Sequence, residues 1–132
     1  MGYRFEFDRV NKILLGRFEG RFTNESAAEF YEAIRRYSTA TNATAGIWDF
    51  SSVTEFAASA EFIRQLAARE PAMRDAAHRP GFIVAPASFL FGLSRMFQIA
   101  GEMKRPLLKV VHTMNEALAA LGVPDPHFEL LE

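Results

Sequence analysis

The side chains that most often perform chemistry in proteins are few and scattered along this chain of 132 residues. Its three histidines, His78, His112 and His127, form no i, i+4 pair of the kind that holds a metal ion on a helix. Cysteine is absent, which excludes disulfides, thiolate nucleophiles and thiolate metal sites. The sequence also lacks the glycine-rich loops that bind phosphates or dinucleotides. We therefore expect a protein that is not an enzyme and that uses no metal ion or cofactor.

Two positions come nearest to a catalytic group. The segment from Gly92 to Met96 has part of the spacing of a nucleophile elbow around Ser94, but the elbow needs glycine at position 96 and follows a strand, whereas this segment lies inside an expected helix. We expect Ser94 to be an ordinary helical serine. Asp49 ends a short apolar run and could act as a general base. A carboxylate without a partner more often accepts hydrogen bonds in a turn or cap.

The pattern of apolar residues indicates strands and helices in alternation. Strands are expected where apolar residues alternate with polar ones or form short buried runs: 3–8, 13–19, 46–50, 82–84 and 107–111. Helices are expected where apolar residues recur every three or four positions: 25–37, 59–70, 88–103 and 113–122. The order β-β-α-β-α-β-α-β-α predicts an α/β fold with an N-terminal hairpin and a largely parallel sheet, because such alternation requires crossover connections.

The expected hairpin and core rest on particular residues. Asn11 stands in the hairpin loop and tolerates a left-handed backbone. Gly16 and Gly20 lie on the apolar face of the second strand and leave room for close packing. The core is expected to take apolar residues from every strand and helix: Phe5, Phe18, Ile34, Ile47, Phe62, Ile83, Leu93, Val110 and Leu118.

Three loops are expected to meet at the carboxyl ends of the parallel strands, where ligands bind in open α/β sheets. They are 51–59, 85–88 and 112–113, and a helix with a hydroxyl residue at its start follows each of them. The free backbone N–H groups at such starts suit an anion, although the same hydroxyls would serve as ordinary N-caps. The candidate ligand or partner residues in these loops are Asp49, Ser51, Ser52, Thr54, Ser88 and Thr113.

The last helix has the clearest bounds. Thr113 and Glu116 have the spacing of a capping box, and Gly122 stands where a C-cap glycine belongs. We expect one domain over residues 1–122, followed by a C-terminal tail over residues 123–132 whose apolar side chains dock on the body.

The third helix is apolar over nearly its whole circumference, whereas a surface helix shows an apolar stripe of about 100°. This excess predicts a surface for a protein partner, with a homodimer as one form: Phe89, Phe91, Met96, Phe97 and Met103. Alternatively, the C-terminal tail covers this helix. If the helix instead lines a closed pocket, binding of a small ligand is favoured.

Composition and charge exclude several classes of partner. Hydrophobic residues make up 49% of the chain and charged residues 23%, which is typical of a globular domain. The net charge of −1 predicts no attraction to nucleic acid or to an anionic membrane. We expect a cytoplasmic protein without a membrane span. The basic pairs Arg35-Arg36 and Lys104-Arg105 are expected to be solvated or to lie at helix C-termini.

The sequence resembles STAS domains of the SpoIIAA-like group, the domains of sulfate transporters and anti-sigma factor antagonists. The resemblance covers roughly residues 3–122 and rests on the order of elements and on two segments. The first is Ile47-Trp48-Asp49-Phe50-Ser51-Ser52-Val53-Thr54, followed by Ser59 at a helix start. The second is Val110-Val111-His112-Thr113 with Glu116-Ala117-Leu118. The resemblance implies a sheet of βα units with helices packed against it.

In that family the central strand is commonly followed by Val-Thr, two further residues and Asp-Ser-Ser-Gly, and a partner kinase phosphorylates the second serine. Val53 and Thr54 match this pattern. Alanines stand at the positions of the aspartate, the first serine and the glycine, namely Ala57, Ala58 and Ala60. Ser59 takes the position of the phosphorylated serine. It is therefore a candidate for phosphorylation by resemblance and a candidate N-cap by its place before a helix.

Together these observations predict a regulatory or protein-interaction module that acts through an unknown protein partner. The alternative is a protein that binds a small apolar or anionic ligand at the loops that follow the strands.

Overall fold

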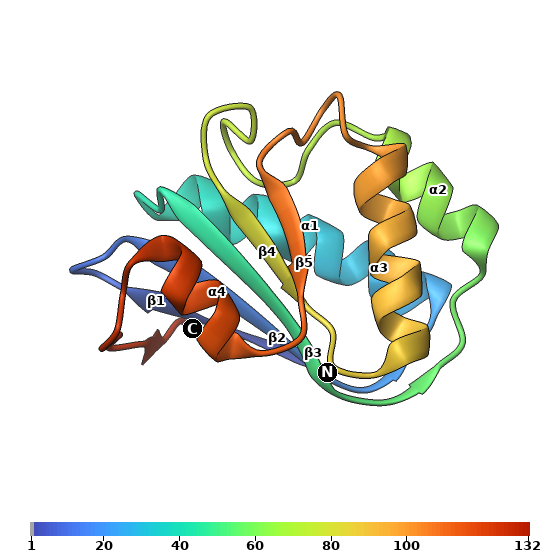
Figure 1. Cartoon of the computed structure of the whole chain (residues 1–132), viewed down its shortest axis with the longest axis horizontal. Coiled ribbons are helices and arrows are strands. Elements are labelled where there is room, and N and C mark those ends of the chain that lie inside the picture. Colours follow the sequence, from blue (N-terminus) through green and yellow to red (C-terminus); the bar gives the residue numbers. More distant parts are fainter. Residues whose placement is uncertain (1) are drawn as a thin grey trace.

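The computed structural model describes residues 2–132 and contains six strands and four helices (Figure 1). The strands are β1 (Tyr3–Asp8), β2 (Ile13–Phe22), β3 (Ala45–Phe56), β4 (Gly81–Val84), β5 (Leu108–Val111) and β6 (Glu129–Leu130). The helices are α1 (Asn24–Ala40), α2 (Ala60–Ala68), α3 (Ser88–Ala100) and α4 (Met114–Leu121). Every strand and helix expected from the apolar pattern is present.

All six strands form one sheet in the order β5-β4-β3-β2-β1-β6. The pairs β2–β3, β3–β4 and β4–β5 are parallel, and β1 pairs antiparallel with β2. These pairings confirm the predicted α/β fold with an N-terminal hairpin. The C-terminal tail adds the edge strand β6, which pairs antiparallel with β1, and the Leu131 N–H donates to the Phe5 carbonyl at 2.8 Å.

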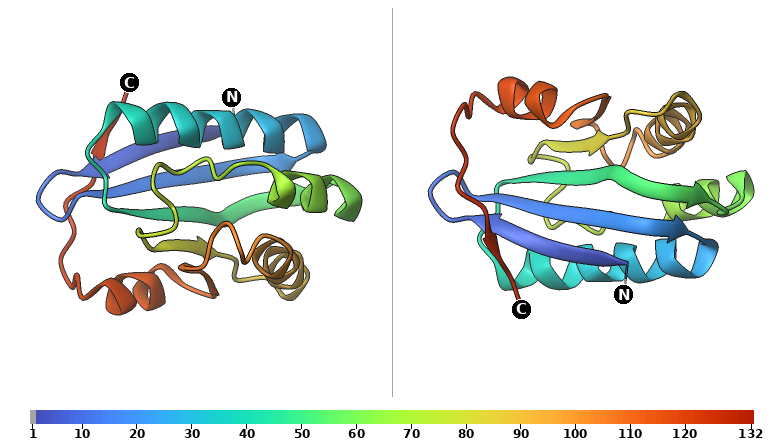
Figure 2. Two further views of the ribbon diagram at one scale, coloured as in Figure 1. Left: turned by 90° about the horizontal axis from the view of Figure 1, so that it is seen from above. Right: turned by 90° about the horizontal axis from the view of Figure 1, so that it is seen from below.

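The helices divide unevenly between the two faces of the sheet (Figure 2). Helices α1, α2 and α3 pack on the first face, on a core that includes Leu14 and Phe18 of β2. Helix α4 packs on the second face, on a smaller cluster that includes Ile13 and Leu15 of the same strand. Successive residues of β2 thus serve opposite cores, because side chains alternate between the faces of a strand.

The expected core is confirmed at its centre and wrong at its edges. Buried side chains occupy five of the expected positions: Phe5, Phe18, Ile34, Ile47 and Ile83. The other four are only half-buried: Phe62, Leu93, Val110 and Leu118. Three of these residues pack against the margins of the two cores: Phe62, Val110 and Leu118. Phe62 and Leu118 lie on outer helices and Val110 on the edge strand β5, and within residues 2–132 no further layer covers these elements.

Strand β3 is longer than the apolar run predicted, and it continues through a polar stretch to Phe56. Ser52 pairs with Glu19 and Val53 with Gly20 of β2, and the register of the two strands shifts on both sides of these pairs. The prediction that Ser51, Ser52 and Thr54 lie in a loop is therefore wrong. Backbone hydrogen bonds to β2 extend β3 through residues whose side chains do not alternate between apolar and polar.

The backbone of the hairpin also departs from expectation. The residue with positive φ is Lys12, at 58°, and not Asn11. Asn11 instead donates its side-chain amide to the Asp8 carboxylate at 2.8 Å. At Gly16 the predicted close packing is confirmed, since a Cβ there would lie 2.8 Å from the Phe5 ring. At Gly20 it is wrong: no atom lies within 4 Å of such a Cβ, and the residue adopts a φ of 85° that favours glycine.

Candidate functional site

Ser59 stands at the start of α2 and is exposed. Its hydroxyl accepts a hydrogen bond from the backbone N–H of Phe62 at 3.1 Å, so the predicted N-cap is present. Its own backbone N–H donates to the side-chain oxygen of Asn24, the first residue of α1, at 2.9 Å. This bond ties the start of α2 to the start of α1.

An exposed aromatic side chain lies next to this helix start. Phe89, at the beginning of α3, is 67% exposed, and its ring meets that of Phe56 edge-on at 5.8 Å. Phe56 is the last residue of β3 and precedes Ser59 by three positions. We call the surface formed by Phe56, Ser59 and Phe89 the helix-start surface.

The residues expected in the strand-end loops do not form a single site. Asp49 is buried on the second face of the sheet, where it accepts hydrogen bonds from Ser51 and from the Arg17 guanidinium. Ser52 and Thr54 are exposed on β3. The hydrogen bonds from Ser51 agree with the expectation that Asp49 is an acceptor for nearby polar groups.

The expected caps differ between helices. Thr113 caps α4 in a capping box with Glu116, and Gly122 ends that helix in the left-handed conformation, as predicted. Helix α3 differs, because its N-cap is Ala87 and no side chain caps it. The expectation that Ser88 supplies a hydroxyl cap is therefore wrong. Ser88 is already the first helical residue, one position too late for the role.

Of the residues expected to form a partner surface on α3, only those at its two ends are exposed. Phe89 and Met103 are exposed, and Met103 is 97% exposed beyond the end of the helix. Phe91 stacks on His112 at 4.1 Å. Met96 and Phe97 are half-buried and pack against the core. The C-terminal tail does not cover α3, because it pairs with β1 at the opposite edge of the sheet.

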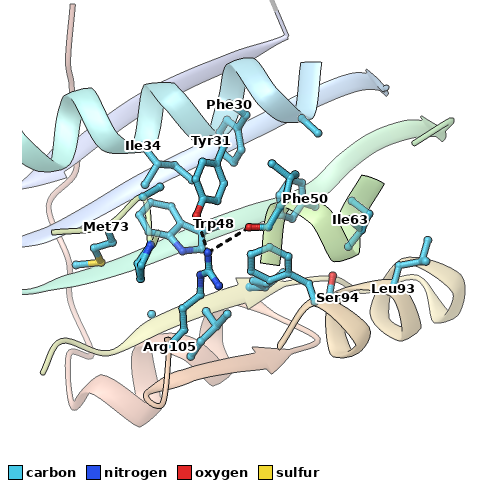
Figure 3. A pocket seen from close by; sticks show the side chains of 18 of the residues that line it. Phe30, Tyr31, Ile34, Trp48, Phe50, Ile63, Met73, Leu93, Ser94 and Arg105 are labelled. Carbon is cyan, nitrogen blue, oxygen red and sulfur yellow. Dashed lines mark hydrogen bonds between the residues drawn. The ribbon is translucent and has the colours of Figure 1, made fainter. Parts of the chain in front are cut away.

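A cavity of about 130 Å³ lies between the sheet and the three helices of the first face. Figure 3 shows its walls, which come from α1, β3, α2 and α3. Apolar side chains make most of the lining: Phe22, Phe30, Ile34, Phe50, Phe56, Ile63, Leu66, Met73, Ile83, Leu90, Leu93, Phe97 and Leu108. The apolar circumference of α3 thus has a structural use, because Leu90, Leu93 and Phe97 face this cavity.

A charged side chain stands in the wall of this cavity. Arg105 is only 7% exposed, and its guanidinium donates to the Ala67 carbonyl at 2.8 Å, to the Arg69 carbonyl at 3.1 Å and to the Tyr31 hydroxyl. Its carbon Cζ also lies 4.8 Å from the centre of the Phe97 ring. Of the two expectations for Arg105, a solvated position is wrong, whereas a place at a helix C-terminus agrees with its bonds to the last carbonyls of α2. Its partners are 36 to 74 positions away in the sequence, so no local pattern could reveal them.

Two uncharged side chains of the lining have polar atoms without partners. In the part of the chain that the structure describes, neither the indole N–H of Trp48 nor the hydroxyl of Ser94 makes a hydrogen bond, and no fully enclosed side-chain N or O atom is unsatisfied. Both atoms must therefore touch open space, and both residues line the cavity. Ser94, expected to be an ordinary helical serine, faces the core of the protein.

Residues 2–132 contain no group of histidine and acidic side chains placed to hold a metal ion. None of the described helices has the length and apolar character needed to cross a membrane.

Comparison with known proteins identifies the fold. No protein-family model and no curated protein matches the sequence. The unphosphorylated form of the anti-sigma factor antagonist SpoIIAA is similar in structure, with a TM-score of 0.61 and 13% identity over 93% of this chain and 99% of that chain. The phosphorylated form of the Bacillus cell fate determinant SpoIIAA gives a TM-score of 0.52 and 17% identity over 90% of this chain and 98% of that chain. The chain therefore has the SpoIIAA-like STAS fold that its sequence resembles.

Proposed function

We propose that this chain is a non-enzymatic regulatory module that binds a protein partner through the helix-start surface. The observation that carries the proposal is the exposure of Phe89, whose ring is two-thirds exposed beside Phe56 and the N-cap Ser59. Burial of a phenylalanine side chain contributes about 1.5–3 kcal/mol, so a partner with an apolar pocket gains by covering it. The fold supports this function, because the similar structures include an anti-sigma factor antagonist.

Ser59 is the position of this surface at which a modification would matter most. One of the similar structures is a phosphorylated form, and the sequence resemblance places Ser59 at the phosphorylated serine. A phosphate at the start of α2 would be stabilised by the free N–H groups of the helix. The alternative is that Ser59 only caps the helix, which fits the alanines at 57, 58 and 60. Phosphoproteomics of the native host separates the two roles.

We further propose that the chain forms a homodimer through the far end of α3. Three exposed apolar side chains gather there: Ile99 at 61%, Met103 at 97% and Leu107 at 39%. Sedimentation equilibrium at micromolar concentration should give twice the mass of 14.9 kDa. The Met103→Glu variant should sediment as a monomer, while Phe89→Glu should remain a dimer. A wild-type monomer at these concentrations would contradict the proposal.

A photo-crosslinking experiment tests the partner surface directly. A benzophenone side chain is placed at position 89, on the helix-start surface, or at position 10, in the hairpin, where Val10 is equally available at 81% exposed. After irradiation in the native host, the cytoplasmic fraction is analysed for crosslinked protein. We expect one protein to be crosslinked from position 89 and not from position 10, and the crosslink to weaken in Ser59→Asp. Equal crosslinking from both positions, or none from position 89, would contradict the proposal.

A further inference from the structure

We propose that the cavity beneath α1, α2 and α3 is a binding site for a small aliphatic monocarboxylate. In this arrangement the hydrocarbon chain lies among the apolar side chains beside Ser94, and the carboxylate lies against Arg105 and Trp48, which are close together in Figure 3. This site shares Phe56 with the helix-start surface but does not include Ser59 or Phe89, and it is not the strand-end site expected from the sequence.

The size of the cavity sets the size of the ligand. An apolar cavity of about 150 Å³ in another protein stays dry and binds benzene, which has six carbon atoms. The cavity here is slightly smaller, at about 130 Å³, and its lining is almost entirely apolar. A hydrocarbon part of about five or six carbons fits this volume. Hexanoate is therefore a suitable probe.

The polar groups around the cavity set the chemistry of the head group. Five side chains of the lining carry hydrogen-bond donors: Tyr31, Trp48, Arg79, Ser94 and Arg105. Tyr31 donates to the Glu70 carbonyl. Arg79 donates to the Ala43 carbonyl and lies 3.7 Å from Asp75. The remaining donors are the Arg105 guanidinium, the Trp48 indole and the Ser94 hydroxyl, and none of them has a carboxylate partner among residues 2–132. The lining contains no aspartate or glutamate. A ligand with acceptor oxygens can therefore be bound, whereas an ammonium group would meet a buried positive charge and no acceptor carboxylate.

The charge of Arg105 makes an anionic head group the best match. Its terminal nitrogens donate to Leu66, Ala67, Arg69 and Tyr31, all of which are uncharged acceptors. Among residues 2–132 no carboxylate forms an ion pair with it, and its Nε makes no hydrogen bond there. A buried charge is costly unless it is paired, so a carboxylate brought by the ligand supplies the missing counter-charge. The carbonyls at the end of α2 hold the guanidinium in place for this contact.

Trp48 provides a direct readout of occupancy, because it is the single tryptophan of the chain and lines the cavity. The purified full chain is titrated with hexanoate, hexylamine or 1-hexanol while Trp48 fluorescence is recorded. We expect a saturable change with hexanoate. Its dissociation constant should be at least about tenfold lower than those of the alcohol and the amine, since a charge-assisted hydrogen bond contributes that factor or more.

Two variants of α3 locate the site. Ser94→Leu adds volume inside the cavity where the hydrocarbon chain lies, so it should weaken hexanoate binding about tenfold or more. Ser88→Leu makes the same substitution at an exposed position of the same helix and should leave the affinity unchanged. Thermal unfolding confirms that both variants are folded before titration.

The outcomes decide the proposal in either direction. Selective, saturable binding of hexanoate that is lost in Ser94→Leu and kept in Ser88→Leu supports it. No saturable change with hexanoate, equal affinity for 1-hexanol or hexylamine, or unchanged binding in folded Ser94→Leu overturns it. If Ser94→Leu does not fold, Ser94→Ala replaces it, because alanine removes the hydroxyl with little change in volume. Retained affinity in that variant together with no selectivity for the carboxylate overturns the proposal as well.

Discussion

The two faces of the sheet are built from the same strands but are covered differently. On the first face, three helices bury a large aromatic core that leaves a cavity of about 130 Å³ beside Arg105. On the second face, α4 covers a small cluster, and farther along β2 and β3 this face carries a network of ion pairs. In the network, Arg17 lies 2.9 Å from Glu6 and 3.1 Å from Asp49.

The two faces differ in the groups that pair with their arginine side chains. Arg17 on the second face is balanced by two carboxylates of the protein itself. Arg105 on the first face has only carbonyls and a hydroxyl as partners. Arg17 therefore has its counter-charges within the protein, whereas Arg105 has no carboxylate partner among the described residues and lies next to free volume. This difference is why we place the ligand on the first face.

The largest expected effect comes from emptying the aromatic core of the first face. Phe18 is buried, and its ring meets Phe22 at 4.9 Å and Phe30 at 5.6 Å, both edge-on. Phe18→Ala should lower the free energy of unfolding by about 3–5 kcal/mol. Phe89→Ala removes an exposed ring and should change it by less than about 0.5 kcal/mol. Urea denaturation of both variants measures the two values, and similar losses would mean that the assigned burial is wrong.

Asp8, on the second face, gives the next largest effect. Burial acts to raise the pKa of its carboxyl, but hydrogen bonds from Asn11, His127 and Val10 outweigh it and lower the pKa below its ordinary value. Asp8→Asn should lower the free energy of unfolding at pH 7 by about 2–3 kcal/mol, because one acceptor oxygen is replaced by a donor.

The pH dependence of the stability of Asp8→Asn tests whether the pKa of the Asp8 carboxyl is lowered in the folded state. A group whose pKa is lower in the folded state stabilises the fold above its unfolded pKa of about 4 and loses this contribution as the pH falls through the folded value. The stability difference between wild type and Asp8→Asn should therefore be constant from pH 5 to pH 7 and shrink below about pH 4. A difference that grows on acidification would contradict the assignment.

Features that depend on residues close together in the sequence could be predicted, whereas features that depend on contacts between distant residues could not. The parallel strands, the Ser59 cap and the capping box of α4 follow from periodicity and short spacings, so these predictions are confirmed. The polar half of β3 was missed, because it is held by backbone pairing with β2. For Arg105 a helix C-terminus was one of the two expectations, but its burial and its choice of α2 could not be predicted, since they depend on residues such as Tyr31, 74 positions away.

A smaller effect on the free energy of unfolding is expected at the starts of α2 and α3, because only α2 has a side-chain cap. Ser59→Ala removes the hydroxyl that accepts from Phe62 and should lower the free energy of unfolding by about 1 kcal/mol. Ser88→Ala is the matched control, because α3 has no side-chain cap, and its effect should stay within about 0.5 kcal/mol. Equal effects in thermal unfolding would show that capping does not distinguish the two helices.

The smallest expected effect lies at the exposed end of the ion network. Arg4 pairs with Glu6 at 3.2 Å and with Glu19 at 3.4 Å, but its side chain is nearly half exposed. Arg4→Gln should cost less than about 1 kcal/mol at low salt. In about 1 M NaCl the cost should vanish, because the screening length falls to about 3 Å. A larger, salt-independent loss would indicate that packing and not charge holds this side chain.

The account depends most on the claim that the first face, and not the second, holds the ligand site. A nuclear magnetic resonance titration of the ¹⁵N-labelled chain with hexanoate tests it, because Trp48 gives the single indole N–H signal. A saturable shift of that signal is expected, with hexylamine as the inactive control and with the amide signals of α4, such as that of Ala117 on the second face, unchanged. An indole signal that does not move with hexanoate, or shifts centred on α4, would contradict it.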